Sequence, residues 1–125
     1  MEAYQIVTKP DYIDVIIERN VDKEGIIATF YALNETKGFL KKDILWHFKG
    51  NIQPLNYHDT HFITKLAESI YPANAPAKKH AFVCDSMFVR AASELFAKEA
   101  TILPFEIKVF DDYDQAVQWL TAPEA

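Results

Sequence analysis

The first apolar residues of the chain alternate with polar ones and indicate a β-hairpin. Tyr4–Val7 and Tyr12–Glu18 are rich in β-branched and aromatic residues, and Lys9–Pro10–Asp11 suit the turn between them. Successive side chains of a strand point to opposite faces. One face of the second strand then carries Ile13, Val15 and Ile17, and the other carries Tyr12, Asp14 and Ile16. We expect the first face in the core and the second partly in water.

Residues 22–37 fit a helix better than a strand. Asp22 is a suitable N-cap, and Gly38 stands where a left-handed cap is required. Apolar residues recur at helical spacing at Ile26, Ile27, Phe30 and Leu33. The segment 26–31 also has strong strand propensity, so a strand is the alternative here.

From residue 43 onward, short apolar runs alternate with amphipathic segments. Ile44–Phe48 and Ala81–Cys84 are typical of strands buried on both faces, and Phe105–Phe110 alternates as a strand should. Helices are expected after three cap positions: Asp59, with Pro72 ending that helix, then Asp85 or Ser86, and then Asp112. The expected apolar stripes are Phe62, Ile63, Leu66, Ala67, Ile70 and Tyr71; then Met87, Phe88, Ala91, Ala92, Leu95 and Phe96; then Tyr113, Ala116, Val117 and Leu120.

This order of elements predicts an α/β fold. Strands that alternate with helices imply crossover connections and a mostly parallel sheet, here of about five strands with four helices. The N-terminal hairpin adds an antiparallel edge. Because 125 residues suit one core, we expect residues 1–125 to form a single domain.

Composition narrows the choice of partner. The formal net charge is −5, and an acidic surface gains nothing from counterion release on a phosphate backbone, which argues against nucleic acid. The one cysteine, Cys84, excludes an internal disulfide and suits a reducing cytoplasm. The chain start does not look like a signal peptide, and the longest nearly apolar run, 26–33, is far shorter than the ~20 residues that span a bilayer. We therefore expect a soluble, cytoplasmic protein with no transmembrane segment, for which peripheral membrane contact stays open.

Several segments resemble a known family. They are Lys79–Asp85 (KHAFVCD), Ala91–Phe96 (AASELF), Glu106–Phe110 (EIKVF), Ala116–Leu120 (AVQWL) and Ile44–Phe48 (ILWHF). Together with the element order, they resemble the SpoIIAA-like family of the STAS superfamily, which has a SEC14 (CRAL-TRIO)-like fold. The resemblance implies a domain that binds a partner or ligand: a protein in a bacterial regulatory pathway, a second copy of itself, or a lipid.

The phosphorylation switch of that superfamily is missing. Its anti-sigma factor antagonists carry a serine in an Asp-Ser-Ser-Gly-like turn after the central strand. The corresponding residues 50–60 read GNIQPLNYHDT, in which Thr60 and Tyr57 are the hydroxyl residues. The resemblance therefore does not imply a phosphoserine-switched antagonist.

Candidate catalytic and metal-binding residues are few. Cys84 ends a strand before a helix N-terminus, where a thiolate is stabilised, and His47 is the candidate base; simple core packing of Cys84 is the favoured interpretation. His58 and His61 can share a helix face, but a closed zinc site needs four ligands, and no Cys/His spacing supplies the others. Phosphate-binding glycine loops and nucleophile elbows are absent from the sequence. We predict a non-enzymatic protein with no metal and no cofactor.

The surplus of large apolar residues suggests a ligand or an interface, with core packing as the competing interpretation. Open α/β folds bind ligands beyond the carboxyl ends of their strands. The candidate ligand-binding residues are therefore Trp46, His47, Leu55, Tyr57, His58, Cys84 and Asp85. Our leading prediction is a module that binds a lipid or another apolar small molecule there. The alternative is a STAS-type protein–protein interaction domain, as a homodimer or with another protein.

Overall fold

The elements of the chain follow the predicted order. The computed structural model describes residues 4–18, 20–36, 38–50, 56–71, 78–84, 86–99 and 105–122. Its strands are β1 (Tyr4–Thr8), β2 (Tyr12–Ile17), β3 (Asp43–Phe48), β4 (Lys78–Cys84) and β5 (Phe105–Phe110). Its helices are α1 (Lys23–Asn34), the short 3-10 turn η1 (Phe39–Lys41), α2 (Tyr57–Ile70), α3 (Met87–Glu99) and α4 (Tyr113–Thr121).

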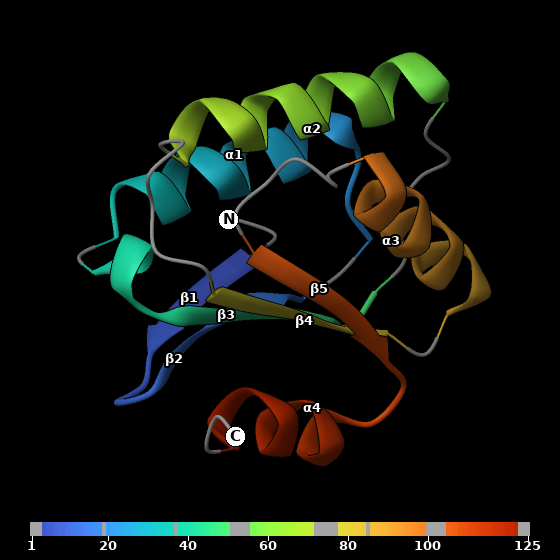
Figure 1. Ribbon diagram of the computed structural model, residues 1–125. Helices are drawn as coiled ribbons and strands as arrows, with labels where there is room; N and C mark the ends of the chain where they lie inside the picture. The colour runs from blue at the N-terminus through green and yellow to red at the C-terminus, as the bar shows by residue number, and fades with distance from the viewer. Residues whose placement is uncertain are drawn as a thin grey trace.

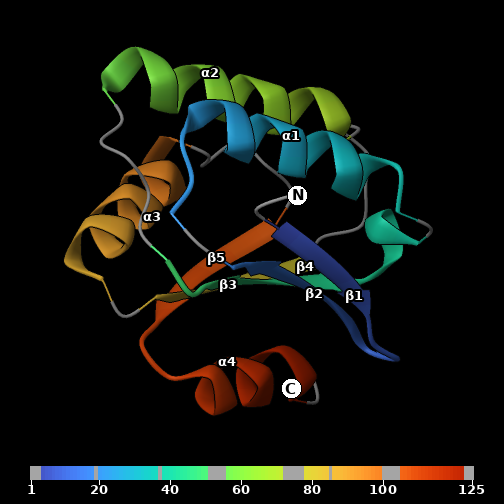
Figure 2. The same ribbon diagram turned by 180° about the vertical axis from the view of Figure 1, so that it is seen from behind.

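The five strands form one mixed sheet in the order β1-β2-β3-β4-β5. The β1–β2 pair is antiparallel, and the other three pairs are parallel. Parallel crossovers are right-handed in nearly all folds, so crossovers that advance in one direction place their helices on the same face. Accordingly α1, α2 and α3 cover one face, and α4 lies alone against the other (Figures 1 and 2). The predicted fold class is confirmed.

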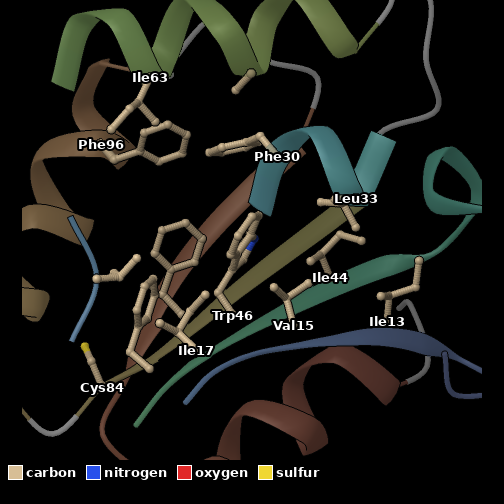
Figure 3. Close-up of a cluster of buried hydrophobic side chains, with 14 of the residues drawn as sticks. Ile13, Val15, Ile17, Phe30, Leu33, Ile44, Trp46, Ile63, Cys84 and Phe96 are labelled. Carbon is tan, nitrogen blue, oxygen red and sulfur yellow. The ribbon is translucent and has the colours of Figure 1, made fainter. Parts of the chain in front are cut away.

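The larger core lies between the sheet and the helices α1, α2 and α3. Ile13, Val15 and Ile17 on β2 point into it and are at most 1% exposed, as their alternation predicted. Leu33 of α1 meets them from the helix side (Figure 3). Full burial of such a side chain contributes about 1.5–3 kcal/mol. Because the larger core contains most of the buried apolar side chains of the described residues, this face of the sheet carries most of the hydrophobic stabilisation.

A smaller core lies under α4. It joins Tyr12 of β2 and Leu45 of β3 to Ala116 and Leu120 of α4. Strand alternation therefore divides β2 and β3 between two cores, one on each face of the sheet.

The helical prediction for residues 22–37 is confirmed in α1. The side chain of Asp22 accepts a hydrogen bond from the backbone N of Gly25 at 2.9 Å, as an N-cap should. Phe30 and Leu33 are buried on the inner face of the helix. Gly38 has φ 83°, a conformation that glycine adopts without strain, and it begins the η1 turn.

The start of α2 differs from the prediction. Asn56 is the N-cap, with its Oδ1 accepting from the backbone N of Asp59 at 2.8 Å. Asp59 Oδ2 accepts in return from the backbone N of Asn56 at 3.2 Å. Both residue types are good N-caps, and the reciprocal capping box selects the earlier one. Asp59 is thus inside the helix, and the prediction that it caps the helix was wrong.

Two predicted apolar stripes are partly wrong. On α3, Met87 is 88% exposed and Leu95 is 40% exposed, whereas Val89, Ser93 and Phe96 are buried. On α2, Phe62 is 53% exposed. Apolar residues occur around most of α3, so local periodicity did not fix its rotation; the packed face is the one that brings Phe96 against the strand residue Phe82, with ring centroids 5.9 Å apart. Within the described residues, no helix has the length and apolar character needed to cross a membrane.

Candidate functional site

An apolar cavity of about 60 Å³ lies inside the larger core. It is bounded by side chains of α1, α2, α3, β3 and β4: Ile26, Phe30, Trp46, Phe48, Thr60, Ile63, Phe82, Ala92, Ser93 and Phe96. Figure 3 shows Phe30 above Trp46 on one side and Ile63 beside Phe96 on another. Trp46, Phe48 and Phe82 come from the carboxyl-terminal halves of their strands.

Aromatic rings form a continuous wall around this cavity. The ring centroids of Phe30 and Trp46 are 5.1 Å apart, and those of Trp46 and Phe82 are 6.0 Å apart. Phe82 continues the series to Phe48 at 6.2 Å and to Phe96 at 5.9 Å. Tilted and offset contacts at these distances are favourable for aromatic rings, so the wall is held by ring–ring contacts between residues of four different elements, α1, β3, β4 and α3.

Two buried polar side chains, His80 and Tyr71, hold the indole of Trp46 in place through hydrogen bonds. Its Nε1–H donates to Nδ1 of His80 at 3.3 Å, and His80 is 2% exposed. Because an indole nitrogen only donates, Nδ1 of His80 must be the accepting nitrogen. Nε2 of His80 lies 3.4 Å from the hydroxyl oxygen of Tyr71. Burial raises the pKa of the Tyr71 hydroxyl far above its usual value, so the group stays neutral.

A second hollow, of about 360 Å³, opens at the carboxyl edge of the sheet. It is lined by His47, Phe48, Lys49, Val83, Cys84, Asp111 and Tyr113. The rings of His47 and Tyr113 are in contact, with centroids 4.9 Å apart. Phe48 lines both this hollow and the apolar cavity, so its side chain borders a polar space and an apolar one.

Tyr113 connects the hollow to a buried carboxylate. Its hydroxyl donates to Oδ2 of Asp14 at 2.8 Å and lies 3.2 Å from the hydroxyl of Tyr12. Asp14 is 4% exposed, and its Oδ1 has no hydrogen-bond partner among the described residues. Burial raises the pKa of the Tyr113 hydroxyl, and its hydrogen bonds to Tyr12 and Asp14 raise it further.

The structure brings only some of the predicted site residues together. Trp46 lines the apolar cavity, and His47 and Cys84 line the hollow. Tyr57 and His58 are exposed at the start of α2 and line neither space. Leu55 and Asp85 lie outside the described residues.

The geometry also bears on the predicted chemistry of Cys84 and of the histidines. Cys84 is buried in the larger core, whereas the ring of His47 contacts α4 on the opposite face of the sheet. His61 is stacked on Tyr57, with ring centroids 6.0 Å apart. Among the described residues, no three His, Cys, Asp or Glu side chains are grouped as metal ligands would be.

Most residues of the apolar cavity were not predicted. Phe30, Ile63 and Phe96 belong to helical stripes that the sequence does show, but a stripe alone indicates only burial. Ser93 and Thr60 are the hydroxyl residues of the lining, and each interrupts or flanks an apolar stripe. A small polar residue at a core-facing position of a helix is the sequence signal that indicates such a cavity.

Comparisons with known proteins concern the fold. No family model matches the sequence, and none of the curated proteins does. The chain is similar to the crystal structure of an uncharacterised protein of the DUF3478 family, with a SpoIIAA-like fold, from Shewanella loihica PV-4. The two share 17% identity with a TM-score of 0.56, over 94% of this chain and 92% of the other. The chain therefore has the SpoIIAA-like α/β fold that its segments between residues 44 and 120 predicted.

Proposed function

We propose that this domain is a non-enzymatic binding module for a small apolar or amphipathic molecule. The observation that carries the proposal is the apolar cavity, whose wall holds five aromatic rings near the carboxyl ends of β3 and β4. Ligand sites of this kind are lined mainly by hydrophobic and aromatic side chains. The SEC14-like resemblance of the sequence supports the same class of ligand.

The size of the cavity limits what enters it. Its volume of about 60 Å³ exceeds the roughly 10–15 Å³ that one water requires. It is well below the roughly 300 Å³ at which pockets for drug-sized ligands begin. A benzene ring occupies a cavity of about 150 Å³, so a short run of carbon atoms, and not a ring, is the part of the ligand that the cavity accepts. A whole acyl chain requires α2 and α3 to separate.

The neighbouring hollow supplies space for a polar part of the ligand. It is about six times larger than the cavity, at about 360 Å³ against about 60 Å³. His47, Lys49 and Tyr113 offer it hydrogen-bonding groups. Because Phe48 is common to both linings, rotation of that side chain is the movement that would join them.

Mass spectrometry of the purified protein, under native conditions and after solvent extraction, tests the proposal. A stoichiometric apolar or amphipathic compound is expected in the extract. The variant Ala92→Leu adds carbon atoms inside the cavity and should lose the compound, whereas Ala91→Leu adds the same atoms on the exposed side of α3 and should retain it. Equal occupancy of both folded variants would show that the compound binds elsewhere and would refute this site.

A second candidate function, protein–protein interaction, rests on exposed apolar side chains. Tyr57 is 62% exposed, Phe62 is 53% exposed and Met87 is 88% exposed. Sedimentation of the protein over a range of concentrations tests this alternative. A dimer that dissociates on Phe62→Ser would favour it, and a monomer at all concentrations would leave it without support from self-association.

A further inference from the structure

We propose that the hollow at the carboxyl edge of the sheet binds an organic cation, an ammonium group that carries methyl or methylene substituents. This inference rests on the proposed function, because it specifies the polar part of that ligand. The lining of the hollow contains both groups that such a cation requires, aromatic rings and a carboxylate. The cation belongs either to a free amine or to a lipid headgroup, and binding of choline and of phosphocholine separates these sources.

The hollow is large enough for such a group and is lined in part by aromatic rings. Its volume of about 360 Å³ lies within the range of roughly 300–1,000 Å³ that small-molecule sites occupy. His47, Phe48 and Tyr113 contribute aromatic side chains to its lining. The face of an aromatic ring attracts a cation that lies within about 6 Å of its centroid, and quaternary ammonium ligands are recognised in this way. These rings therefore favour a cation whose surface is partly apolar.

Asp14 makes the ring of Tyr113 a better partner for a cation. The hydroxyl of Tyr113 donates a hydrogen bond to Oδ2 of Asp14 at 2.8 Å. Asp14 is 4% exposed, its Oδ1 has no hydrogen-bond partner among the described residues, and none of their cationic side chains forms an ion pair with it. A phenol that donates to a carboxylate gains electron density in its ring, and the uncompensated charge of Asp14 adds a negative potential there. Both effects strengthen the attraction of Tyr113 for a cation.

The charged side chains that line the hollow also favour a cation. Asp111 is exposed at the hollow. Lys49 carries the opposite charge, but its ammonium nitrogen lies 3.9 Å from a carboxylate oxygen of Glu18. At that distance Glu18 offsets much of the charge of Lys49. The balance of charge around the hollow is therefore negative.

An anion would be the expected ligand of a free helix N-terminus, and α4 begins beside the hollow. That position is already occupied by a side chain of the protein. Oδ1 of Asp112 accepts from the backbone N of Asp114 at 2.8 Å and from that of Gln115 at 3.3 Å. A phosphate or carboxylate of a ligand would have to displace this carboxylate and would also meet Asp111. The start of α4 therefore disfavours an anion in the hollow.

Binding of choline and of neohexyl alcohol, its neutral isostere, tests the inference. In neohexyl alcohol a carbon atom replaces the nitrogen of choline, so the two probes share a shape and a hydroxyl group and differ in charge. Choline is only slightly larger than benzene, for which a cavity of about 150 Å³ suffices. In NMR titrations of the wild-type protein, we expect choline to bind about 3-fold to 10-fold more tightly than the alcohol. The ring protons of His47 and Tyr113 should show saturable shifts.

Three variants locate the cation. Asp111→Asn should weaken choline binding about 2-fold to 5-fold, and Lys49→Gln should strengthen it about 2-fold. Neither variant should change the binding of neohexyl alcohol. Glu106→Gln is the matched control, because it removes the same charge as Asp111→Asn from an exposed residue near the amino end of β5 that does not line the hollow. It should leave both affinities unchanged.

Equal affinities for choline and neohexyl alcohol, or equal effects of Asp111→Asn and Glu106→Gln, would overturn the inference. The absence of saturable shifts with choline in the folded protein would overturn it as well. None of these results concerns the apolar cavity, whose occupancy is measured with Ala92→Leu, so failure of the proposed function is a separate observation. We expect phosphocholine to bind more weakly than choline, because its phosphate meets acidic side chains, and this result assigns the site to a free amine. Tighter binding of phosphocholine would retain the cation and assign it to a lipid headgroup.

Discussion

The substitution Tyr113→Phe should reveal how strongly the buried carboxylate of Asp14 depends on one donor. The hydroxyl of Tyr113 donates to Oδ2 of Asp14 at 2.8 Å, and Oδ1 has no partner among the described residues. Phenylalanine keeps a ring in position to contact His47 and removes only the hydroxyl oxygen. The measured effect is then that of the hydrogen bond and of the carboxylate left behind.

The magnitude follows from the burial of Asp14, which is 4% exposed. A hydrogen bond to a charged group contributes about 1.5–3 kcal/mol, and a buried polar group left without a partner adds a desolvation cost. We expect Tyr113→Phe to lower the free energy of unfolding by about 2–3 kcal/mol. In an Asp14→Leu background the Tyr113 hydroxyl retains only the 3.2 Å contact with Tyr12, and the same change should cost about 0.5–1 kcal/mol.

Urea unfolding of the four proteins in this double-mutant cycle gives the coupling energy between Asp14 and Tyr113. We expect about 1.5–2 kcal/mol, as is typical of residues in direct contact. Tyr31→Phe, at a tyrosine that is 55% exposed, is the control and should change stability by less than about 0.5 kcal/mol. A coupling energy below about 0.5 kcal/mol would refute the reasoning, because Asp14 would then be satisfied by some other group.

Two further predictions concern pH and helix capping. Burial raises the pKa of the Tyr71 hydroxyl above its usual value near 10, so its contribution to stability is complete below about pH 10 and is lost as the pH rises further. Urea unfolding at increasing alkaline pH should show this loss, and Tyr71→Phe should reduce its slope; an unchanged slope would assign the loss to other groups. Asn56→Ala should lower the free energy of unfolding by about 1 kcal/mol, because α2 loses its capping box. Asn56→Asp should preserve the thermal melting temperature, and equal melting of both variants would contradict the role of the cap.

Much of the fold could be predicted because the relevant signals are local. The apolar run Ile44–Phe48 indicates a buried strand without any knowledge of its neighbours. Asp112 caps α4, as predicted. Its side-chain Oδ1 accepts hydrogen bonds from the backbone N of Asp114 and from that of Gln115. Where two local signals competed, as at Asn56 and Asp59, the sequence offered two acceptable caps, and the reciprocal hydrogen bonds decided between them.

The candidate site was harder to predict because its residues are brought together only by tertiary packing. Tyr113 and Asp14 are separated by 99 positions, and neither residue type in isolation indicates the other. The rotation of α3, which buries Ser93 and exposes Met87, depends on how the helix meets the sheet. The division of His47 and Cys84 between the two faces likewise depends on the register of β3 and β4, which pairs His47 with Val83 and Phe48 with Cys84.

The strand order of the sheet has a consequence for synthesis of the chain. Because spatial order equals chain order, each new strand joins the outer edge of the sheet already made, and none has to be inserted between two paired strands. The sheet can therefore grow as the chain emerges from the ribosome, N-terminal segment first. Growth of this kind exposes an unpaired edge at every stage, and β5 is the last one. The charged side chains of Glu106 and Lys108 on that strand disfavour addition of a strand from another molecule. The sheet topology would allow a further strand to pair with β5, and these charges oppose it.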